Sequence, residues 1–185
     1  LFAASLLAAS VGAYVGLYSS LGATVAGNYW LFVILELGLL VGLMFAKRKS
    51  GLNLILLFAF TFVSGLTLTP ILGRTFAMPG GAAIVAQAFT LTTVAFGGLS
   101  VFAMNTKRDF TAMGKMLFIT LIVLLVAAII NIFFHSPVLQ LAIASVGAVL
   151  FSAYILYDTQ NIIRGNYETP IEGAVALYLD FVNLF

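Results

Sequence analysis

Two segments near the end of the chain, YILYDTQN (residues 154–161) and LYLDFVN (residues 177–183), each place one aspartate in or beside apolar sequence. Asp158 ends one apolar stretch, and Asp180 lies inside the next one, where almost all of its neighbours are apolar. A charged aspartate at the bilayer centre costs about 2.5–3.5 kcal/mol on the insertion scale. A membrane helix carries such a residue only if it is protonated, paired or hydrated. The two aspartates are therefore the first candidates for a function.

The composition is that of a multi-spanning membrane protein. Hydrophobic residues make up 63% of the 185-residue chain and charged residues 8%, whereas a soluble domain carries about 25% charged residues. The apolar runs are continuous rather than alternating, which favours helices over strands. The chain has no cysteine, which excludes disulfides and thiolate metal sites. We predict a single all-α transmembrane domain over residues 1–185.

Seven apolar stretches are separated by polar, glycine or proline residues. They are residues 1–22, 30–46, 52–73, 82–104, 114–134, 137–158 and 171–185. A helix needs about 20 apolar residues to cross a bilayer, so we predict seven transmembrane helices, the last one short. Because the chain begins with Leu1, we interpret the first stretch as a span whose beginning, with the N-terminus, is missing. Pro70 is predicted to kink the third span near its outer end.

The basic residues indicate the orientation in the membrane. Of the eight, seven lie after the second, fourth and sixth stretches: Lys47, Arg48, Lys49, Lys107, Arg108, Lys115 and Arg164. Only Arg74 falls on the other side. The positive-inside rule places the side that carries seven basic residues in the cytoplasm, and the N-terminus lies on the same side.

The two aspartates could form a pair. A turn separates them, so two antiparallel helices could bring their carboxyl groups into contact, with Asn161 and Asn183 as supporting polar residues. Two carboxylates in an apolar site cannot easily both ionise, so they share a proton and titrate as a pair. A proton-sensitive gate follows as a hypothesis, closed when protonated and open when ionised. When ionised, Asp158 and Asp180 also offer hard oxygen ligands for Ca²⁺. For Asp158, an interfacial position near Arg164 is the alternative.

Other polar residues carry weaker signals. Glu36, in the second stretch, either marks the outer half of an ion path or pairs with Arg74. His135 is expected at the membrane interface rather than as a ligand. The Gly-x-Gly-Asp motif of two-aspartate intramembrane proteases is absent at Asp180, and we find no phosphate loop, zinc motif or nucleic-acid-binding surface. The sequence therefore predicts no enzyme, no cofactor and no nucleic-acid partner.

Three segments together resemble a known family: FVSGLTLTP (residues 62–70), YILYDTQ (residues 154–160) and LYLDFVNLF (residues 177–185). They resemble the transmembrane Bax inhibitor motif (TMBIM) family, bacterial members above all, over essentially the whole chain. The resemblance implies six helices around a short central seventh. It also implies a pH-sensitive Ca²⁺ leak, with Asp158 and Asp180 as the proton sensor. An arginine latch on the cytoplasmic side closes family members, and Arg48 is our candidate for it.

Three functions remain open at this point. The first is a pH-sensitive calcium leak channel of the bacterial inner membrane, with calcium as the transported ion and Asp158, Asp180 and Glu36 along its path. The second is a non-conducting regulator that binds a membrane-bound ATP-dependent protease, as the resemblance implies for some bacterial relatives. The third is a proton-coupled transporter, for which Pro70 is the one hint of a broken helix.

Overall fold

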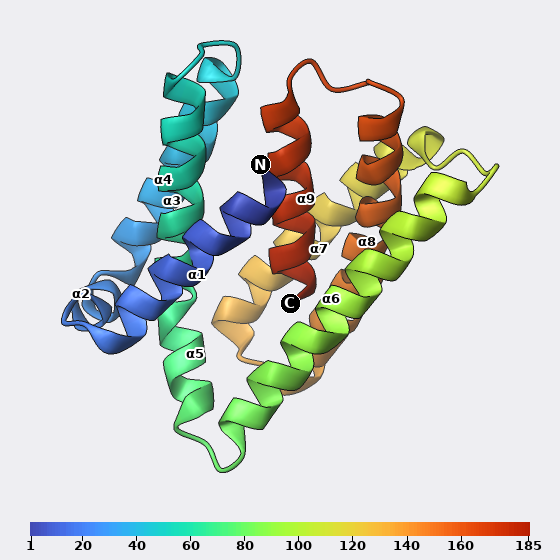
Figure 1. Ribbon diagram of the computed structural model, residues 1–185. Helices are drawn as coiled ribbons and strands as arrows, with labels where there is room; N and C mark the ends of the chain where they lie inside the picture. Colours follow the sequence, from blue (N-terminus) through green and yellow to red (C-terminus); the bar gives the residue numbers. More distant parts are fainter. The chain divides into compact units, whose positions relative to one another are not determined.

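The structure is a computed structural model that describes residues 1–185, and it contains helices and no strands (Figure 1). The helices are α1 (Phe2–Tyr18), α2 (Leu21–Gly27), α3 (Tyr29–Ala46), α4 (Leu52–Thr67), α5 (Thr69–Phe76), α6 (Gly81–Asn105), α7 (Gly114–Phe134), α8 (Pro137–Ile163) and α9 (Pro170–Leu184). A 3₁₀ turn, η1, covers Thr111–Met113. The prediction of an all-helical protein is confirmed.

Five helical segments are long and apolar enough to cross a membrane. A sixth is added if α1 and α2, which meet at an angle of 91°, are counted as one bent span. The bend falls inside the first apolar stretch, residues 1–22, for which the sequence predicts one span. The last stretch forms α9, with 15 residues, and is not among the five. The multi-spanning character is confirmed, and the arrangement around a central seventh helix stays a prediction.

The chain divides into two compact units. The first comprises residues 1–88 and 168–178, and the second comprises residues 89–167 and 179–185. In the first unit α4 packs against both α1 and α3, and in the second α7 packs against α8. The unit boundaries fall inside α6, in the loop between α8 and α9, and inside α9, and each unit is described separately below.

Glycines allow α1 and α4 of the first unit to approach closely. A Cβ atom added at Gly12 would lie 2.1 Å from the carbonyl oxygen of Phe62, and one at Gly65 would lie 1.9 Å from that of Ala9. Helices in lipid associate through such small residues because there is little hydrophobic force between them. The α4 surface around Gly65 is thus a helix-packing face.

The third span is interrupted close to Pro70, where the sequence predicts a kink. The helix is interrupted at Leu68, and α5 resumes with proline in its first turn, where the missing N–H is not needed. The two pieces together, Leu52–Phe76, have the length and hydropathy of one span.

Both helices of the C-terminal third begin with recognisable caps. Ser136 precedes α8, and its side chain accepts a hydrogen bond from the Leu139 amide at 3.3 Å. At α9, Thr169 and Glu172 form a capping box: Glu172 Oε2 accepts from the Thr169 amide at 3.2 Å, and Thr169 Oγ1 accepts from the Glu172 amide at 3.4 Å. In each case proline occupies the first helical position.

Candidate functional site

The end of α8 carries four consecutive buried polar residues, Asp158, Thr159, Gln160 and Asn161, which are between 4% and 6% exposed. Successive side chains on a helix are turned by about 100°, so the four face different neighbours. Buried polar groups are unfavourable unless they are hydrogen-bonded. This segment is therefore a place where each side chain needs a specific partner.

Three of the four fasten α8 to the polypeptide around it. Gln160 accepts from the Phe110 amide at 2.7 Å and donates to the Arg108 carbonyl at 2.8 Å and the Ala103 carbonyl at 3.3 Å. Thr159 donates to the Ser100 hydroxyl of α6 at 3.4 Å. Asn161, predicted as a supporting residue, accepts from the Asn166 side chain at 2.8 Å.

The fourth residue, Asp158, meets Asp180. The two carboxyl groups lie close to each other within the second unit, and both residues are buried, at 5% and 3% exposed. Two neighbouring carboxyl groups can hydrogen-bond to each other only if one of them carries a proton. Asp180 Oδ2 is buried, and no hydroxyl or N–H group donates to it. The pair is thus short of donors for two negative charges.

Aromatic packing fixes the α9 side of the pair. Phe181, next to Asp180, lies between two rings of α6, with centroid distances of 5.9 Å to Phe89 and 5.6 Å to Phe96. Both contacts are edge-to-face, a favourable geometry for aromatic pairs. The helix that carries Asp180 is therefore held against α6 by the adjacent residue.

A tyrosine completes the group and was missed by the sequence analysis. Tyr167, in the loop between α8 and α9, donates its hydroxyl to Asp158 Oδ1 at 2.5 Å. Burial, together with the nearby Asp158 carboxylate, raises the pKa of Tyr167 far above its ordinary value of 10.0, so that the phenol stays a neutral donor. It lies in a polar turn, RGNYETP (residues 164–170), and no spacing rule in the sequence reveals the direction of its hydroxyl.

Other residues expected at the site lie elsewhere. Asn183 is exposed and donates to the Leu179 carbonyl of its own helix at 2.7 Å, so it does not support Asp180. Asn183 lies in the last turn of α9, and its side chain turns back to its own helix. Arg164 pairs with Asp109 at 2.7 Å and with the Thr111 hydroxyl at 3.1 Å. Asp158 is a buried member of the pair rather than an interfacial partner of Arg164.

Glu36 has a hydroxyl partner in the first unit. Its Oε2 accepts from Thr67 Oγ1 at 2.7 Å, and no ion pair joins it to Arg74. The alternative of structural pairing with Arg74 is therefore not realised. A role of Glu36 in an ion path stays a prediction.

The basic run after α3 forms a cluster of ion pairs within the first unit. Lys47 lies 2.9 Å from Glu168 and 2.5 Å from Glu172, and Arg48 lies 2.8 Å from Glu168. Hydrogen bonds to the two glutamates raise the pKa of Lys47, and hydrogen bonds from Lys47 and Arg48 lower that of Glu168. Arg48 is thus engaged with Glu168, and its role as a latch for the aspartates stays a prediction.

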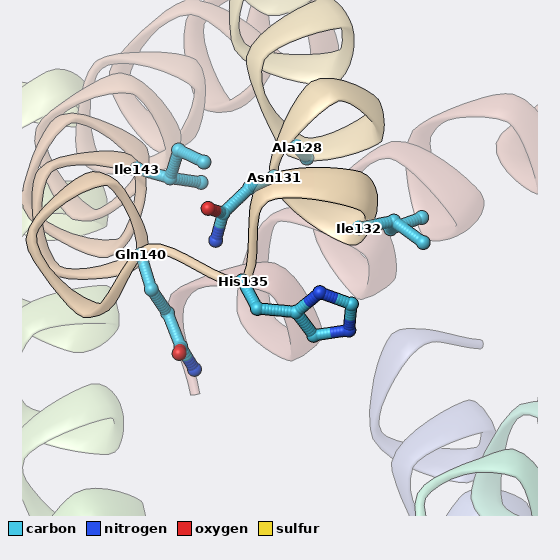
Figure 2. Close-up of a pocket in the computed structure, with 6 residues that line it drawn as sticks. All are labelled: Ala128, Asn131, Ile132, His135, Gln140 and Ile143. Atoms are coloured by element: carbon cyan, nitrogen blue, oxygen red, sulfur yellow. The ribbon is translucent and has the colours of Figure 1, made fainter.

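An open depression of about 400 Å³ lies at the turn between α7 and α8 (Figure 2). Figure 2 shows the imidazole of His135 turned away from the amides of Asn131 and Gln140. His135 has a left-handed backbone with φ 49° and closes α7, and Asn131 Oδ1 accepts from the Ser136 amide at 3.0 Å. These polar groups shape the turn and do not converge on a ligand.

A resident metal centre would need more ligands than the aspartate pair supplies. The structure contains no cluster of three or more histidine, cysteine, aspartate or glutamate side chains. Ca²⁺ takes about six to eight oxygen ligands. Asp158 and Asp180 could therefore contact a passing cation but do not form a high-affinity site by themselves.

Comparison with known proteins finds a matching family model and similar proteins for this chain. The family model described as "Inhibitor of apoptosis-promoting Bax1" matches residues 1–185. A Campylobacter jejuni protein of uncharacterised function is 65% identical over 100% of this chain and 81% of its own. An uncharacterised membrane protein of Vibrio cholerae is 42% identical over 78% of this chain and 67% of its own. Mouse protein lifeguard 4 is 38% identical over 84% of this chain and 63% of its own. The chain therefore belongs to the transmembrane Bax inhibitor motif family.

Proposed function

We propose that this protein is a pH-sensitive calcium leak channel of the bacterial inner membrane, gated by Asp158 and Asp180. The observation that carries the proposal is the close approach of these two buried carboxyl groups. The proposed architecture is a seven-helix domain around a short central α9, with the N-terminus in the cytoplasm. Acidic side chains inside membrane helices commonly mark ion pathways and proton relays.

The gate follows from the protonation of the pair. With one proton shared, the carboxyl groups hold α8 and α9 together through their hydrogen bond, which is the closed state. Loss of that proton leaves two adjacent negative charges in a site of low dielectric constant, where repulsion is strong. The unpartnered Oδ2 of Asp180 adds to the instability of the doubly ionised state. Opening of the gate relieves both effects.

The same chemistry favours a leak over tight binding. Two ionised carboxylates attract Ca²⁺, and with so few protein ligands the ion keeps part of its hydration shell. Conduction requires a site that binds strongly enough to admit an ion and weakly enough to release it. The pair meets both requirements, because it carries two negative charges only when the gate is open.

The test is Ca²⁺ flux into liposomes that contain the purified protein, measured from pH 5 to pH 9. We expect flux to rise with pH in the wild type and to lose its pH dependence in Asp180→Asn, which cannot ionise. Asp109→Asn is the matched control, because this carboxylate is exposed and lies outside the spans. We expect its pH profile to match the wild type.

Two outcomes would contradict the proposal. An unchanged pH profile in both Asp158→Asn and Asp180→Asn would remove the sensor role. No flux above that of empty liposomes at any pH would remove the channel, and would favour a non-conducting regulator of a membrane-bound ATP-dependent protease.

A further inference from the structure

We propose that Tyr167 is a positioning residue for the aspartate pair: its hydroxyl holds Asp158 and sets the pH at which the gate responds. This inference rests on the proposed gating role of Asp158 and Asp180. Tyr167 does not contact the transported ion in this proposal. It acts through the carboxyl group to which it donates.

The geometry of the contact is specific. The Tyr167 hydroxyl lies 2.5 Å from Asp158 Oδ1, a distance typical of hydrogen bonds between a hydroxyl and a carboxylate. Besides Asp180, Tyr167 is the one side chain that hydrogen-bonds Asp158. A neutral donor directed at a buried carboxylate stabilises the ionised form relative to the protonated form.

The loop is built to aim this side chain. Gly165 adopts a left-handed conformation with φ 68°, which only glycine reaches without strain. The chain then turns back onto the end of α8: the Asn166 amide donates to the Asn161 carbonyl at 2.9 Å, and its side chain donates to Asn161 Oδ1 at 2.8 Å. With the turn anchored twice, the next residue, Tyr167, is directed at Asp158 three residues before Asn161.

Few other titratable groups face the pair. Asp180 approaches from α9 and Tyr154 from one turn earlier on α8, and Tyr157 lies near Tyr154 and Tyr167. None of these groups is a cation. Tyr154 lies near both aspartates and makes no hydrogen bond to them. The Tyr167 hydroxyl is thus the donor that offsets the repulsion between the two carboxyl groups.

Removal of the hydroxyl is expected to shift the pH midpoint in one direction. In Tyr167→Phe the ionised form of Asp158 loses its donor, so the pair keeps its proton to higher pH. Hydrogen bonds to charged groups correspond to a shift of about one to two pH units. We expect the midpoint of the pH response to rise by that amount. Tyr154→Phe is the control. It removes a hydroxyl that lies near the pair but makes no hydrogen bond to it, so we expect the midpoint to stay unchanged.

The experiment uses two readouts on the full chain. The protonation of the pair is followed by the infrared carbonyl band of the carboxylic acid, assigned with Asp158→Asn, in the purified protein in lipid. Ca²⁺ flux in liposomes is measured over the same pH range. A shift of the infrared midpoint in Tyr167→Phe and none in Tyr154→Phe supports the inference, even if the wild type conducts nothing. Flux without a shift in the infrared midpoint overturns it.

A second variant guards against loss of folding. Incorporation of 3-fluorotyrosine at position 167 keeps the ring and makes the hydroxyl a stronger donor. We expect the midpoint to move to lower pH, opposite to Tyr167→Phe. A residue that only packs against its neighbours would produce no such reversal, and shifts of the same sign in both variants would contradict the positioning role.

Discussion

At Gln160 one buried side chain bonds to three backbone groups, one in the last turn of α6 and two in the segment between α6 and α7. In Gln160→Leu the Phe110 amide and the Arg108 carbonyl lose their partner. Polar groups left unsatisfied on burial destabilise by about 1–3 kcal/mol. We expect the free energy of unfolding, measured by denaturant titration in detergent, to fall by about 2 kcal/mol.

Gln140→Leu is the matched control for this prediction. Gln140 lies on the same helix, and its side chain is exposed and makes no hydrogen bond. The same substitution at this position changes side-chain chemistry without uncovering backbone groups. Equal losses in the two variants would show that Gln160 has no special role in fastening the loop.

Some of the important residues could be predicted from the sequence and others could not. Asp158 and Asp180 could be selected from the sequence because an acid in an apolar stretch is conspicuous by composition. Tyr167 and Gln160 could not, because tyrosine and glutamine are ordinary residues at a helix end or in a polar loop. Their importance comes from the direction of one hydroxyl and one amide, which depends on the turn at Gly165 and on the path of the α6–α7 loop.

Among the elements, α1 and α4 approach each other closely, and glycine is required where their backbones meet. Gly65→Ala would place a Cβ atom 1.9 Å from the Ala9 carbonyl oxygen, so the helices must separate. Overpacking of this kind destabilises by about 1–3 kcal/mol. We expect that loss in the free energy of unfolding.

Gly38→Ala on α3 is the matched control for Gly65→Ala. No atom lies within 4 Å of the Cβ position at Gly38, and alanine favours a helix over glycine by up to about 1 kcal/mol. This variant is expected to be neutral or more stable than the wild type. Destabilisation of both variants to the same extent would contradict the close contact between α1 and α4.

The ion-pair cluster at the start of α9 has its own pH window. The lowered pKa of Glu168 means that its contribution to stability is present above its ordinary value of 4.5 and is lost as pH falls below it. The raised pKa of Lys47 means that its contribution is present below 10.5 and is lost only at higher pH. Between these limits neither Glu168 nor Lys47 changes its charge.

We therefore do not expect Glu168 and Lys47 to act as a sensor that responds near neutral pH. We expect Glu168→Gln, which removes the partner of Lys47 and Arg48, to leave the pH midpoint of Ca²⁺ flux unchanged. The measurement is the liposome assay beside Asp180→Asn. A midpoint displaced as far as in an aspartate variant would assign the sensor to the cluster, and would restore Arg48 as a candidate latch.

Elements could be predicted where a local rule applies. Pro70 indicated the interruption of the third span, and the run TPIE (residues 169–172) has the form of a capping box that begins α9. The 91° bend between α1 and α2 could not be predicted. Its sequence, YSSLG (residues 18–22), contains neither proline nor charge, and hydropathy reports only that the stretch is apolar.

For the whole molecule, the composition is sufficient to predict a membrane protein, because a chain with 8% charged residues has too few of them to form the surface of a soluble protein. The number of spans was harder to predict. Apolar stretches count as spans only if they form straight helices of sufficient length, and α1, α2 and α9 do not meet this condition individually. Tertiary packing, rather than hydropathy, decides how such short helices are accommodated.

The orientation in the membrane is the last expectation that can be tested, and the chain suits the test because it has no cysteine of its own. Ser50→Cys lies in the exposed basic loop after α3, and Met78→Cys lies in the exposed loop after α5. The positive-inside rule places the first in the cytoplasm and the second outside. In intact spheroplasts we expect a membrane-impermeant maleimide to label Met78→Cys at once and Ser50→Cys only after lysis. The reverse pattern would invert the topology, and would place the Tyr167 loop on the outer face, where external rather than cytoplasmic pH would act on the aspartate pair.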